Sequence, residues 1–402
     1  MIKLLTFTTL YPNSVNPAHG IFVETRLRHL VASGEVQSKV IAPVPWFPSK
    51  HPLFGEYAAF SAVPRVEVLN GIEIRHPRYL VLPKIGMTVT PFTLARAGIA
   101  AARKLIAEGY DFDVIDAHYF YPDGVAAVMM GKALGKPVVV TARGTDINLI
   151  PRYALPRRMI LWAAEHCAEI ITVCAALKDE LVALGADGAK ITVLRNGVDL
   201  KLFRPEDRGQ ARAALNITRY SLAAVGRLVE AKGHDLIIRA LPQLQDVELL
   251  IAGTGPCAQA LRELTVSLGV ADRVRFLGRL SQGELRTLYS AVDALVLASV
   301  REGWPNVLLE AMACGTPVIT TRLAGCAEVV TDRAAGVLMR ERSSSAIAEH
   351  VTELRRDAPD RAETRRYAER FSWDDSTVGQ VDLFKRACST TGELRAAALR
   401  ST

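Results

Sequence analysis

Residues 299–317, SVREGWPNVLLEAMACGTP, constrain the fold more than any other stretch of the chain. They lie between two apolar runs, residues 294–298 and 317–321, which have the pattern of strands buried on both faces. Pro305 suits the first turn of a helix because it has no N–H to satisfy, and Gly315 suits the left-handed residue that follows a helix. The segment therefore predicts strand, loop, helix and strand, which is the repeating unit of an α/β fold.

The predicted helix begins at a point that favours a bound phosphate. Its first free amide groups belong to Asn306 and Val307, and they lie at the positive end of the helix dipole. Glu302 is in the loop before the helix and Glu310 is about one turn inside it. Two carboxylates would repel an anion unless they bind another group, and sugar hydroxyls are good donors to a carboxylate. The alternative is that Glu302 caps the helix and Glu310 is solvated.

The sequence EGWPNVLLE resembles the Glu-x7-Glu signature of retaining GT-B glycosyltransferases of family 4, also described as glycosyl transferases group 1. The resemblance implies that Glu302 contacts the transferred sugar and that Glu310 contacts the nucleotide ribose. It also implies that backbone amides near Asn306 and Val307 hold the diphosphate. Gly303 is the glycine of the same signature and belongs to the implied donor site.

Length and composition indicate a soluble globular protein of two domains. The chain has 402 residues, 50% hydrophobic and 23% charged, and this length usually exceeds one hydrophobic core. The net charge of +7 favours anionic ligands or an anionic membrane surface. No dense Lys/Arg run with interleaved aromatic residues supports a nucleic-acid partner. The six scattered cysteines include no C-x-x-C pair, and we expect them to be reduced.

We expect no targeting or membrane-spanning segment. Residues 1–7 lack the apolar region and cleavage site of a signal peptide, and no run of about 18 uncharged apolar residues exists. The expected location is the cytoplasm, and peripheral contact with the inner membrane face stays open. The segment with Arg152, Arg157 and Arg158 is either a basic patch for an anionic membrane or lipid phosphate, or a helix with one solvated face.

Strand ends in the first half carry further candidate residues. Gly20 follows the first strand, where it either allows close approach to a ligand or makes a turn. His118 ends a strand, and Arg143 and Asp146 follow the next one. The context DVIDAHYFYPDG resembles the strand-end histidine of the same family, which implies that His118 faces the donor sugar. The resemblance also implies that Gly20 lies near the donor phosphate and the acceptor.

The same resemblance places Arg143 and Asp146 on the acceptor side; otherwise they pair with each other on the surface and contribute little. The loop at residues 46–64, together with residues 81–91, is assigned to acceptor contacts or membrane docking, because long loops in compact domains are usually functional. We place the domain boundary at about residue 200, between an acceptor-side domain, 1–200, and a nucleotide-sugar domain, 201–373. A last helix at about 374–388 is implied to cross back onto the first domain, and residues 389–402 are expected to fray.

The second half repeats the α/β pattern and contributes two cations. The loop GRLVEAKG follows a strand and carries Arg227 and Lys232. Arginine can grip phosphate oxygens through two N–H groups, and lysine adds a point charge where a leaving group gathers negative charge. Both residues are otherwise ordinary surface cations. The loop matches the phosphate-binding motif of the family in its key positions.

Gly253 and Gly255 begin a G-x-G-x-x-A pattern that partly matches a dinucleotide fingerprint. No acid ends the next strand, where a ribose ligand belongs in that fingerprint. We therefore interpret both glycines as lining the nucleotide site, and the resemblance implies that the backbone at Phe276 and Leu277 meets the base. Ser281 and Glu284 have the spacing of a capping box.

The predicted architecture is α/β, specifically the GT-B fold with two Rossmann-like domains facing across a cleft. The predicted activity is retaining transfer of a sugar from a nucleotide diphosphate sugar, with UDP favoured, to a saccharide or lipid-linked acceptor in polysaccharide or glycolipid assembly. Arg227, Lys232 and the helix start serve the departing diphosphate, so we expect no metal and no other cofactor. Two other classes stay open: a non-catalytic sugar-nucleotide sensor or assembly subunit, and a nicotinamide-dependent oxidoreductase.

Overall fold

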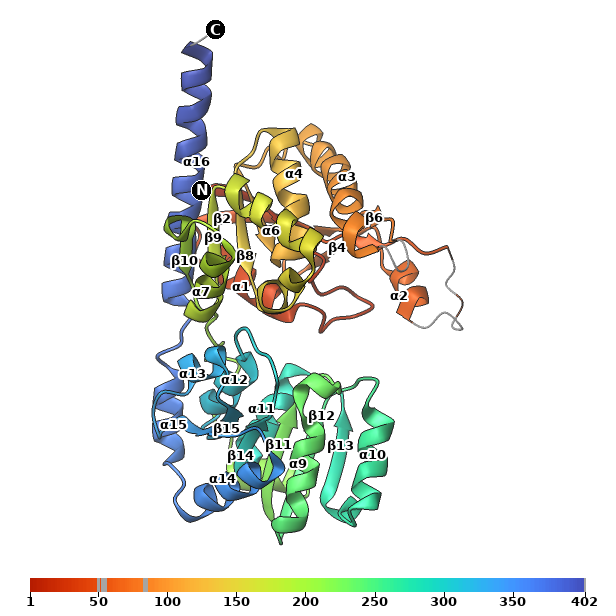
Figure 1. Ribbon diagram of the computed structural model, residues 1–402, viewed down its shortest axis with the longest axis vertical. Helices are drawn as coiled ribbons and strands as arrows, with labels where there is room; N and C mark the ends of the chain where they lie inside the picture. Colours follow the sequence, from red (N-terminus) through yellow and green to blue (C-terminus); the bar gives the residue numbers. More distant parts are fainter. Residues whose placement is uncertain (49–50, 52–55, 82–85, 401–402) are drawn as a thin grey trace. The chain divides into compact units, whose positions relative to one another are not determined.

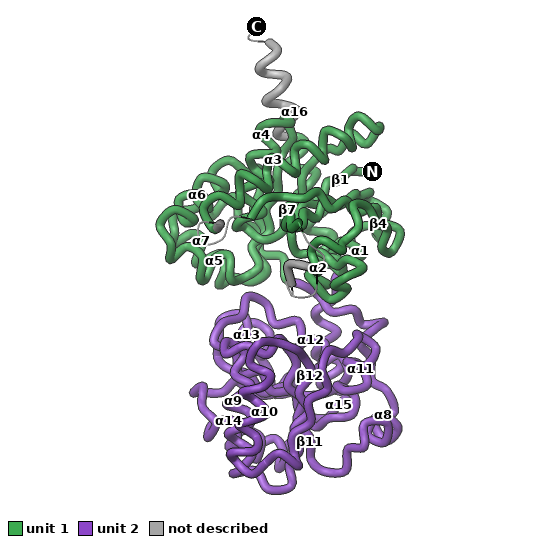
Figure 2. Tube along the Cα trace, turned by 90° about the vertical axis from the view of Figure 1, so that its right-hand side faces the viewer, with its two compact units in different colours: residues 1–195, 374–402 green, residues 196–373 purple. Residues whose placement is uncertain are grey.

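A computed structural model describes residues 1–48, 51, 56–81 and 86–400 of the chain. The chain forms two compact units, shown in different colours in Figure 2: residues 1–195 with 374–402, and residues 196–373. Parts of the two segments assigned to acceptor contacts or membrane docking, residues 49–50, 52–55 and 82–85, lie outside the described residues.

The first unit is built on one large, mainly parallel sheet (Figure 1). Its strands are β1 (Ile2–Phe7), β2 (Val36–Ile41), β4 (Val66–Leu69), β5 (Ile72–Arg75), β7 (Val114–His118), β8 (Val138–Ala142), β9 (Glu169–Thr172) and β10 (Ile191–Val193), while β3 (Val44–Pro45) pairs separately with β6 (Arg78–Tyr79). The order is β10-β9-β8-β7-β1-β2-β5-β4, and the β4–β5 pair is antiparallel. β7 and β8 are buried along their whole length, as apolar parallel strands require.

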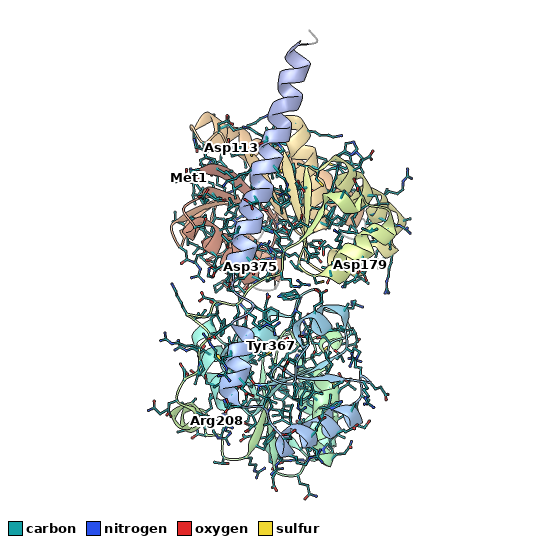
Figure 3. The ribbon with its side chains drawn as sticks, turned by 90° about the vertical axis from the view of Figure 1, so that its left-hand side faces the viewer. Met1, Asp113, Asp179, Arg208, Tyr367 and Asp375 are labelled. Atoms are coloured by element: carbon teal, nitrogen blue, oxygen red, sulfur yellow. The ribbon has the colours of Figure 1, made fainter. Side chains whose placement is uncertain are left out.

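Helices cover this sheet, and the last of them comes from the far end of the chain. They are α1 (Ile21–Ala32), α2 (Glu56–Ala62), α3 (Gly86–Ala107), α4 (Val125–Leu134), α5 (Thr145–Asn148), α6 (Ala154–His166), α7 (Ala175–Leu184) and α16 (Asp374–Arg400). α16 packs against α1, β7 and β8, and Figure 3 shows it running along the first unit from Asp375. Arg26 of α1, 2% exposed, donates from Nε to Gln380 Oε1 of α16 at 2.9 Å.

The second unit has a parallel sheet in the order β13-β12-β11-β14-β15-β16. These strands are β11 (Tyr220–Val225), β12 (Val247–Ala252), β13 (Val274–Gly278), β14 (Ala294–Leu297), β15 (Val318–Thr321) and β16 (Gly336–Met339). Its helices are α8 (Arg208–Ala214), α9 (His234–Ala240), α10 (Ala258–Ser267), α11 (Gln282–Ala291), α12 (Asn306–Ala313), α13 (Ala324–Val329), α14 (Ser344–Arg356) and α15 (Arg361–Ala368). The strand order reverses between β11 and β14, and open α/β sheets bind ligands at the carboxyl ends of such strands.

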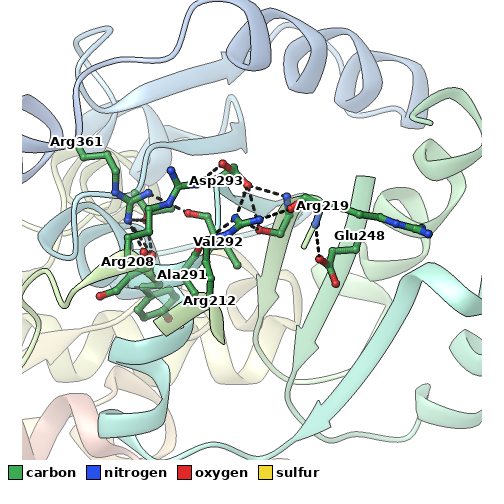
Figure 4. A network of polar contacts seen from close by, with 12 residues as sticks. Arg208, Arg212, Arg219, Glu248, Ala291, Val292, Asp293 and Arg361 are labelled. Atoms are coloured by element: carbon green, nitrogen blue, oxygen red, sulfur yellow. Dashed lines mark hydrogen bonds and ion pairs between the residues drawn. The ribbon is translucent and has the colours of Figure 1, made fainter. Parts of the chain in front are cut away.

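The amino ends of β11 and β14 are held together by a separate polar network (Figure 4). Asp293 accepts from the backbone N–H of Ser221 at 2.8 Å and from Arg212 at 3.3 Å, and it also pairs with Arg208. Arg361 donates to the carbonyl oxygen of Val292 at 3.0 Å. These cations satisfy a carboxylate and carbonyl groups at strand starts, so we assign them a structural role.

The capping box predicted at the start of α11 is confirmed: Ser281 Oγ accepts from the Glu284 N–H, and Glu284 Oε2 accepts from the Ser281 N–H at 2.7 Å. Two predictions about helix extent were wrong. The loop expected at residues 46–64 contains α2, where alanine-rich sequence without proline favours helix. α16 continues to Arg400, because its last turns are rich in alanine and leucine. Among the described residues, no helix is long and apolar enough to span a bilayer.

Gly20 is required by the backbone of its own loop. Its φ is +65°, and a Cβ there would lie 2.2 Å from the carbonyl oxygen of Leu10. The turn reading of this glycine is thus sufficient to explain its presence, whatever ligand the loop contacts.

We predict that Gly20→Ala lowers the free energy of unfolding by about 2 kcal/mol or more, because it adds a backbone clash to left-handed strain. Gly34→Ala is the matched control, since Gly34 has φ +76° but nothing within 4 Å of its Cβ position. That control should cost about 1 kcal/mol from strain alone. Equal losses in urea unfolding would show that the contact with Leu10 is unimportant.

Candidate active site

Glu302 and Ser299, in the loop after β14, lie next to Lys232, which comes from the loop after β11. Lys232 Nζ lies 2.6 Å from Glu302 Oε1. Ser299 Oγ donates to the same carboxylate oxygen at 2.6 Å, and Thr321 Oγ1 donates to the carbonyl oxygen of Ser299 at 2.9 Å. The Glu302 side chain is only 11% exposed. Glu302 is therefore a fixed, charge-compensated group and not a solvated helix cap.

Glycines allow the loops after β11, β12 and β14 to pack directly against one another. A Cβ on Gly233 would lie 2.2 Å from the carbonyl oxygen of Ala298, so Lys232 is next to the end of β14 only because glycine follows it. A Cβ on Gly253 would lie 1.8 Å from the Gly226 oxygen, and one on Gly255 would lie 2.4 Å from the Leu228 oxygen. Gly253 and Gly255 thus pack against the loop that carries Arg227 and Lys232.

The two cations of that loop differ in their surroundings. Lys232 is paired with Glu302, whereas the Arg227 side chain is exposed and makes no hydrogen bond or ion pair with the described part of the chain. An exposed guanidinium on this loop is available to an anion without first breaking an internal contact. An anion that binds Lys232 must compete with the Glu302 carboxylate for it.

α12 starts where its sequence predicts, but the Asn306 N–H, predicted to be free, donates to the carbonyl oxygen of Trp304 at 3.1 Å. The helix begins at Asn306, Pro305 is its N-cap residue, and Gly315 follows its end with φ +80°. The amides of its first turn, including Val307, have no partner within the helix. Gly303 lies against α13, where a Cβ on Gly325 would come within 2.0 Å of the Gly303 oxygen. An anion at this helix start would meet the Val307 amide at the positive end of the dipole, and it would reach the Asn306 amide only after that group leaves the Trp304 oxygen.

Glu310, one turn inside α12, accepts a hydrogen bond at 3.0 Å from the hydroxyl of Tyr289. Burial raises the pKa of Glu310 to about 7, and the Tyr289 hydrogen bond opposes this shift. Glu310 is therefore a half-buried, hydrogen-bonded group and only partly solvated. At neutral pH the carboxyl group is poised between its two protonation states, and hydroxyl donors from a ligand would favour the carboxylate.

Phe276 and Leu277 are half-buried residues at the end of β13. The guanidinium of Arg262 lies 4.4 Å from the centre of the Phe276 ring, so this face of the ring already has a cationic partner. A ligand at this strand end would therefore meet the backbone, as predicted, more readily than the ring face.

In the first unit, His118 ends β7 and is 1% exposed. Arg143 Nη2 lies 2.8 Å from His118 Nδ1, and because arginine only donates, Nδ1 carries no proton. Nε2 then carries the proton and donates to Asp116 Oδ2 at 3.1 Å. Burial lowers the His118 pKa, so the ring is neutral at pH 7. Contact between this ring and a sugar would require one of the two partners to move.

Asp146 has a different role from the surface pair considered above. It is fully buried, and it accepts from the backbone amides of Phe120 at 2.7 Å, Gly144 at 2.7 Å and Arg143 at 3.1 Å. It therefore holds the turn that presents the Arg143 side chain to His118. The surface-pair alternative for these two residues is wrong, while their predicted acceptor contacts stay a prediction.

Sequence reasoning missed several buried partners. Asp116 could have been found, since it is two residues before His118 in the same strand and so shares its face. Asp123 could not: it is fully buried and accepts from Thr9 N at 2.6 Å and Thr9 Oγ1 at 2.9 Å, 114 residues away in sequence. Burial raises the Asp123 pKa to about 7. The described residues contain no group of three or more His, Cys, Asp or Glu side chains arranged for a metal.

Comparisons with known proteins give a consistent result for both halves. The family described as Glycosyltransferase Family 4 matches residues 28–202, and the family described as Glycosyl transferases group 1 matches residues 207–371. A D-inositol 3-phosphate glycosyltransferase of Salinispora tropica is 30% identical over 371 residues, covering 83% of this chain and 77% of the relative. A Bacillus subtilis glycosyltransferase named for teichuronic acid biosynthesis is 27% identical over 358 residues, covering 87% and 88%.

Solved structures show the same fold. Sucrose-phosphate synthase of Thermosynechococcus elongatus has a TM-score of 0.78 at 19% identity, covering 97% of this chain and 100% of that one. The Anabaena protein HepE, in complex with UDP and glucose, has a TM-score of 0.74 at 18% identity, covering 96% and 100%. At these identities the structures support the architecture and not the choice of ligand.

The raised pKa of Glu310 predicts a specific pH dependence of stability. An unfolded glutamate ionises near pH 4.3, whereas Glu310 in the folded protein holds its proton up to about pH 7. The folded state therefore binds more protons between these values, and stability falls as pH rises through this window. The unfolding free energy of the protein minus that of Glu310→Gln should fall between pH 4.5 and 7, by at most about 1.4 kcal/mol per unit, and then level off.

Urea unfolding at four pH values between 4.5 and 7.5 measures this difference. Glu349→Gln, at an exposed position of α14, is the matched control. A difference between the protein and Glu310→Gln that does not change with pH would contradict the prediction.

Proposed function

The chain belongs to glycosyltransferase family 4 and has the GT-B fold, and from this premise we propose that it is a retaining enzyme using a UDP-sugar donor. The observation that carries the proposal is the contact between Lys232 and Glu302 beside the start of α12, at 2.6 Å. A diphosphate needs positive charge and amide donors, and a sugar needs hydroxyl acceptors. This corner of the second unit offers all three from two loops and one helix turn.

The proposed roles follow from this arrangement. Lys232 and Arg227 neutralise the diphosphate, and its oxygens accept from the Val307 amide and from the Asn306 amide, which exchanges the Trp304 oxygen for the ligand. Once the phosphate draws Lys232 away, Glu302 is free to accept hydroxyl groups of the transferred sugar, while Ser299 still fixes one of its oxygens. Glu310 accepts the ribose hydroxyls.

In the proposed reaction the bond between the sugar C1 and the phosphate oxygen breaks first, and its electron pair goes to the leaving diphosphate. The acceptor oxygen then bonds to C1 on the face that the leaving group occupied, and its proton passes to a phosphate oxygen. Configuration is retained without a covalent enzyme intermediate. Lys232, Arg227 and the helix amides supply the charge stabilisation that a metal ion supplies in other transferases.

The donor and the acceptor class have separate support. UDP is the donor nucleotide that the family resemblance favours, and HepE, which shares the fold, was crystallised with UDP and glucose. The names of the two relatives, for inositol phosphate and teichuronic acid, favour an anionic or polysaccharide acceptor. The proposal keeps the roles that the resemblance implies for the first unit: His118 for the donor sugar, Gly20 for the donor phosphate and the acceptor, and Arg143 for the acceptor, whose anionic group would attract the guanidinium. Polysaccharide or glycolipid assembly at the cytoplasmic membrane face fits these roles.

We predict that Lys232→Ala lowers kcat/KM about 1,000-fold, the usual effect of removing one preorganised charge from a leaving group. Lys201→Ala, at an exposed site of the same unit, is the matched control and should keep full activity. Thermal unfolding of both variants checks that the fold is intact. Turnover close to that of the unmodified protein in Lys232→Ala would contradict the assignment.

A binding panel separates the proposed enzyme from other classes. We predict that UDP binds at least about tenfold more tightly than GDP, ADP or NAD, a difference of about 1.4 kcal/mol in calorimetry. Preference for NAD would indicate the oxidoreductase alternative. UDP binding together with no hydrolysis or transfer of any UDP-sugar, in the presence of candidate acceptors, would indicate a sensor.

A further inference from the structure

Trp304 lies within the loop that leads to α12 and has a partner outside that loop. It is 7% exposed, and its indole N–H donates to the carbonyl oxygen of Asn196 at 3.0 Å. The centre of its ring is 6.2 Å from that of Phe371, at an interplanar angle of 54°. A buried tryptophan usually needs a partner for its N–H, and here that partner is a specific backbone oxygen.

Both partners of Trp304 belong to the segments where the chain passes between its two units. The chain leaves the first unit after Arg195 and returns to it at Asp374. We refer to residues 195–198 and 371–376 as the paired connectors, because hydrogen bonds join them on both sides of the boundary.

On the side of the second unit, the Val198 N–H donates to the Phe371 oxygen at 2.9 Å. On the side of the first unit, Ser376 Oγ donates to the Arg195 oxygen. Between these bonds, a Cβ on Gly197 would lie 2.6 Å from the carbonyl carbon of Ser372. The two connectors therefore run in close contact, and any other residue than glycine at position 197 would force them apart.

Asn196 adds a second contact between the first connector and the same corner. Its side chain is 3% exposed and its Nδ2 donates to Asn306 Oδ1 at 3.3 Å. Asn306 is the first residue of α12, at the point where the diphosphate is placed. Asn196 thus contacts the segment around the start of α12 twice. Its backbone oxygen accepts from Trp304, and its side chain donates to Asn306.

We propose that Trp304 and Asn196 are positioning residues that couple donor binding at the start of α12 to the geometry of the paired connectors. The proposal rests on the proposed function, because it takes the corner to be the diphosphate site. A bound diphosphate restricts the loop and the first turn of α12, and Trp304 and Asn196 transmit this restriction to the only two segments through which the described chain joins its units. By linkage, whatever changes the connectors also changes donor affinity.

Packing alone does not account for this arrangement. A phenylalanine at position 304 would keep an aromatic ring beside Phe371 and lose the hydrogen bond to the Asn196 oxygen. Trp304→Phe therefore removes the coupling element while leaving an aromatic residue in the corner. Asn196→Ala removes the other element, the side-chain hydrogen bond to Asn306. It leaves the backbone oxygen of residue 196 that accepts from Trp304.

The test is hydrogen exchange of the connector amides in the full chain, with and without UDP at a concentration that saturates each variant. In the unmodified protein, saturating UDP should slow exchange in peptides covering residues 195–199 and 371–376 by about fivefold or more. Trp304→Phe should still bind UDP but lose most of this slowing. Trp162→Phe, the same substitution in α6, is the matched control and should respond like the unmodified protein.

Saturation is established for each variant by calorimetry, and thermal unfolding shows that each is folded. If Trp304→Phe fails to fold, Asn196→Ala provides the same test with a smaller change. The coupling would be overturned if UDP did not slow connector exchange in the unmodified protein. It would also be overturned if UDP slowed exchange in both Trp304→Phe and Asn196→Ala as much as in the unmodified protein. Neither result would affect the proposed function. Absence of binding by UDP, GDP and ADP would overturn the donor-site assignment and the coupling with it.

Discussion

The contact between Lys232 and Glu302 is the interaction on which the proposed chemistry of the second unit depends. The two residues are 70 positions apart, and they meet because the strand order reverses between β11 and β14 and places the following loops side by side. Gly233 then lets the first loop approach the end of β14 without a clash. A partly buried carboxylate next to the proposed phosphate site would repel the phosphate, and the Lys232 ammonium group reduces this repulsion because it can pair with either anion.

The parts of the protein that sequence reasoning predicted well are those encoded locally. Strands and helices of the second unit follow the apolar spacing, and the capping box at Ser281 needs only four consecutive residues. Glu302, Asn306 and Glu310 belong to one strand–loop–helix segment, so their common location at the start of α12 follows from the helix itself. The fold class and family were predictable for the same reason, since each motif is short and continuous.

The parts that could not be predicted depend on contacts between distant segments. Periodicity shows which face of an element is buried but not which group meets it there. Nothing near Glu310 in sequence indicates Tyr289, and nothing near Trp304 indicates Asn196, 108 residues away. One ring partner of His118, Asp116, lies two residues away in the same strand, but the other, Arg143, follows β8 and meets His118 only in the folded sheet.

The packing of α16 against the first unit has a consequence for the folding of the nascent chain. Arg26 is buried in the first unit, where Nε donates to Gln380 Oε1 at 2.9 Å, and burial lowers its pKa to about 10. A nascent polypeptide that has emerged from the ribosome only as far as residue 195 lacks this carboxamide and the apolar face of α16 that covers β7 and β8. Amino-terminal domains commonly fold during translation, but this one cannot close its interior until α16 has been synthesised.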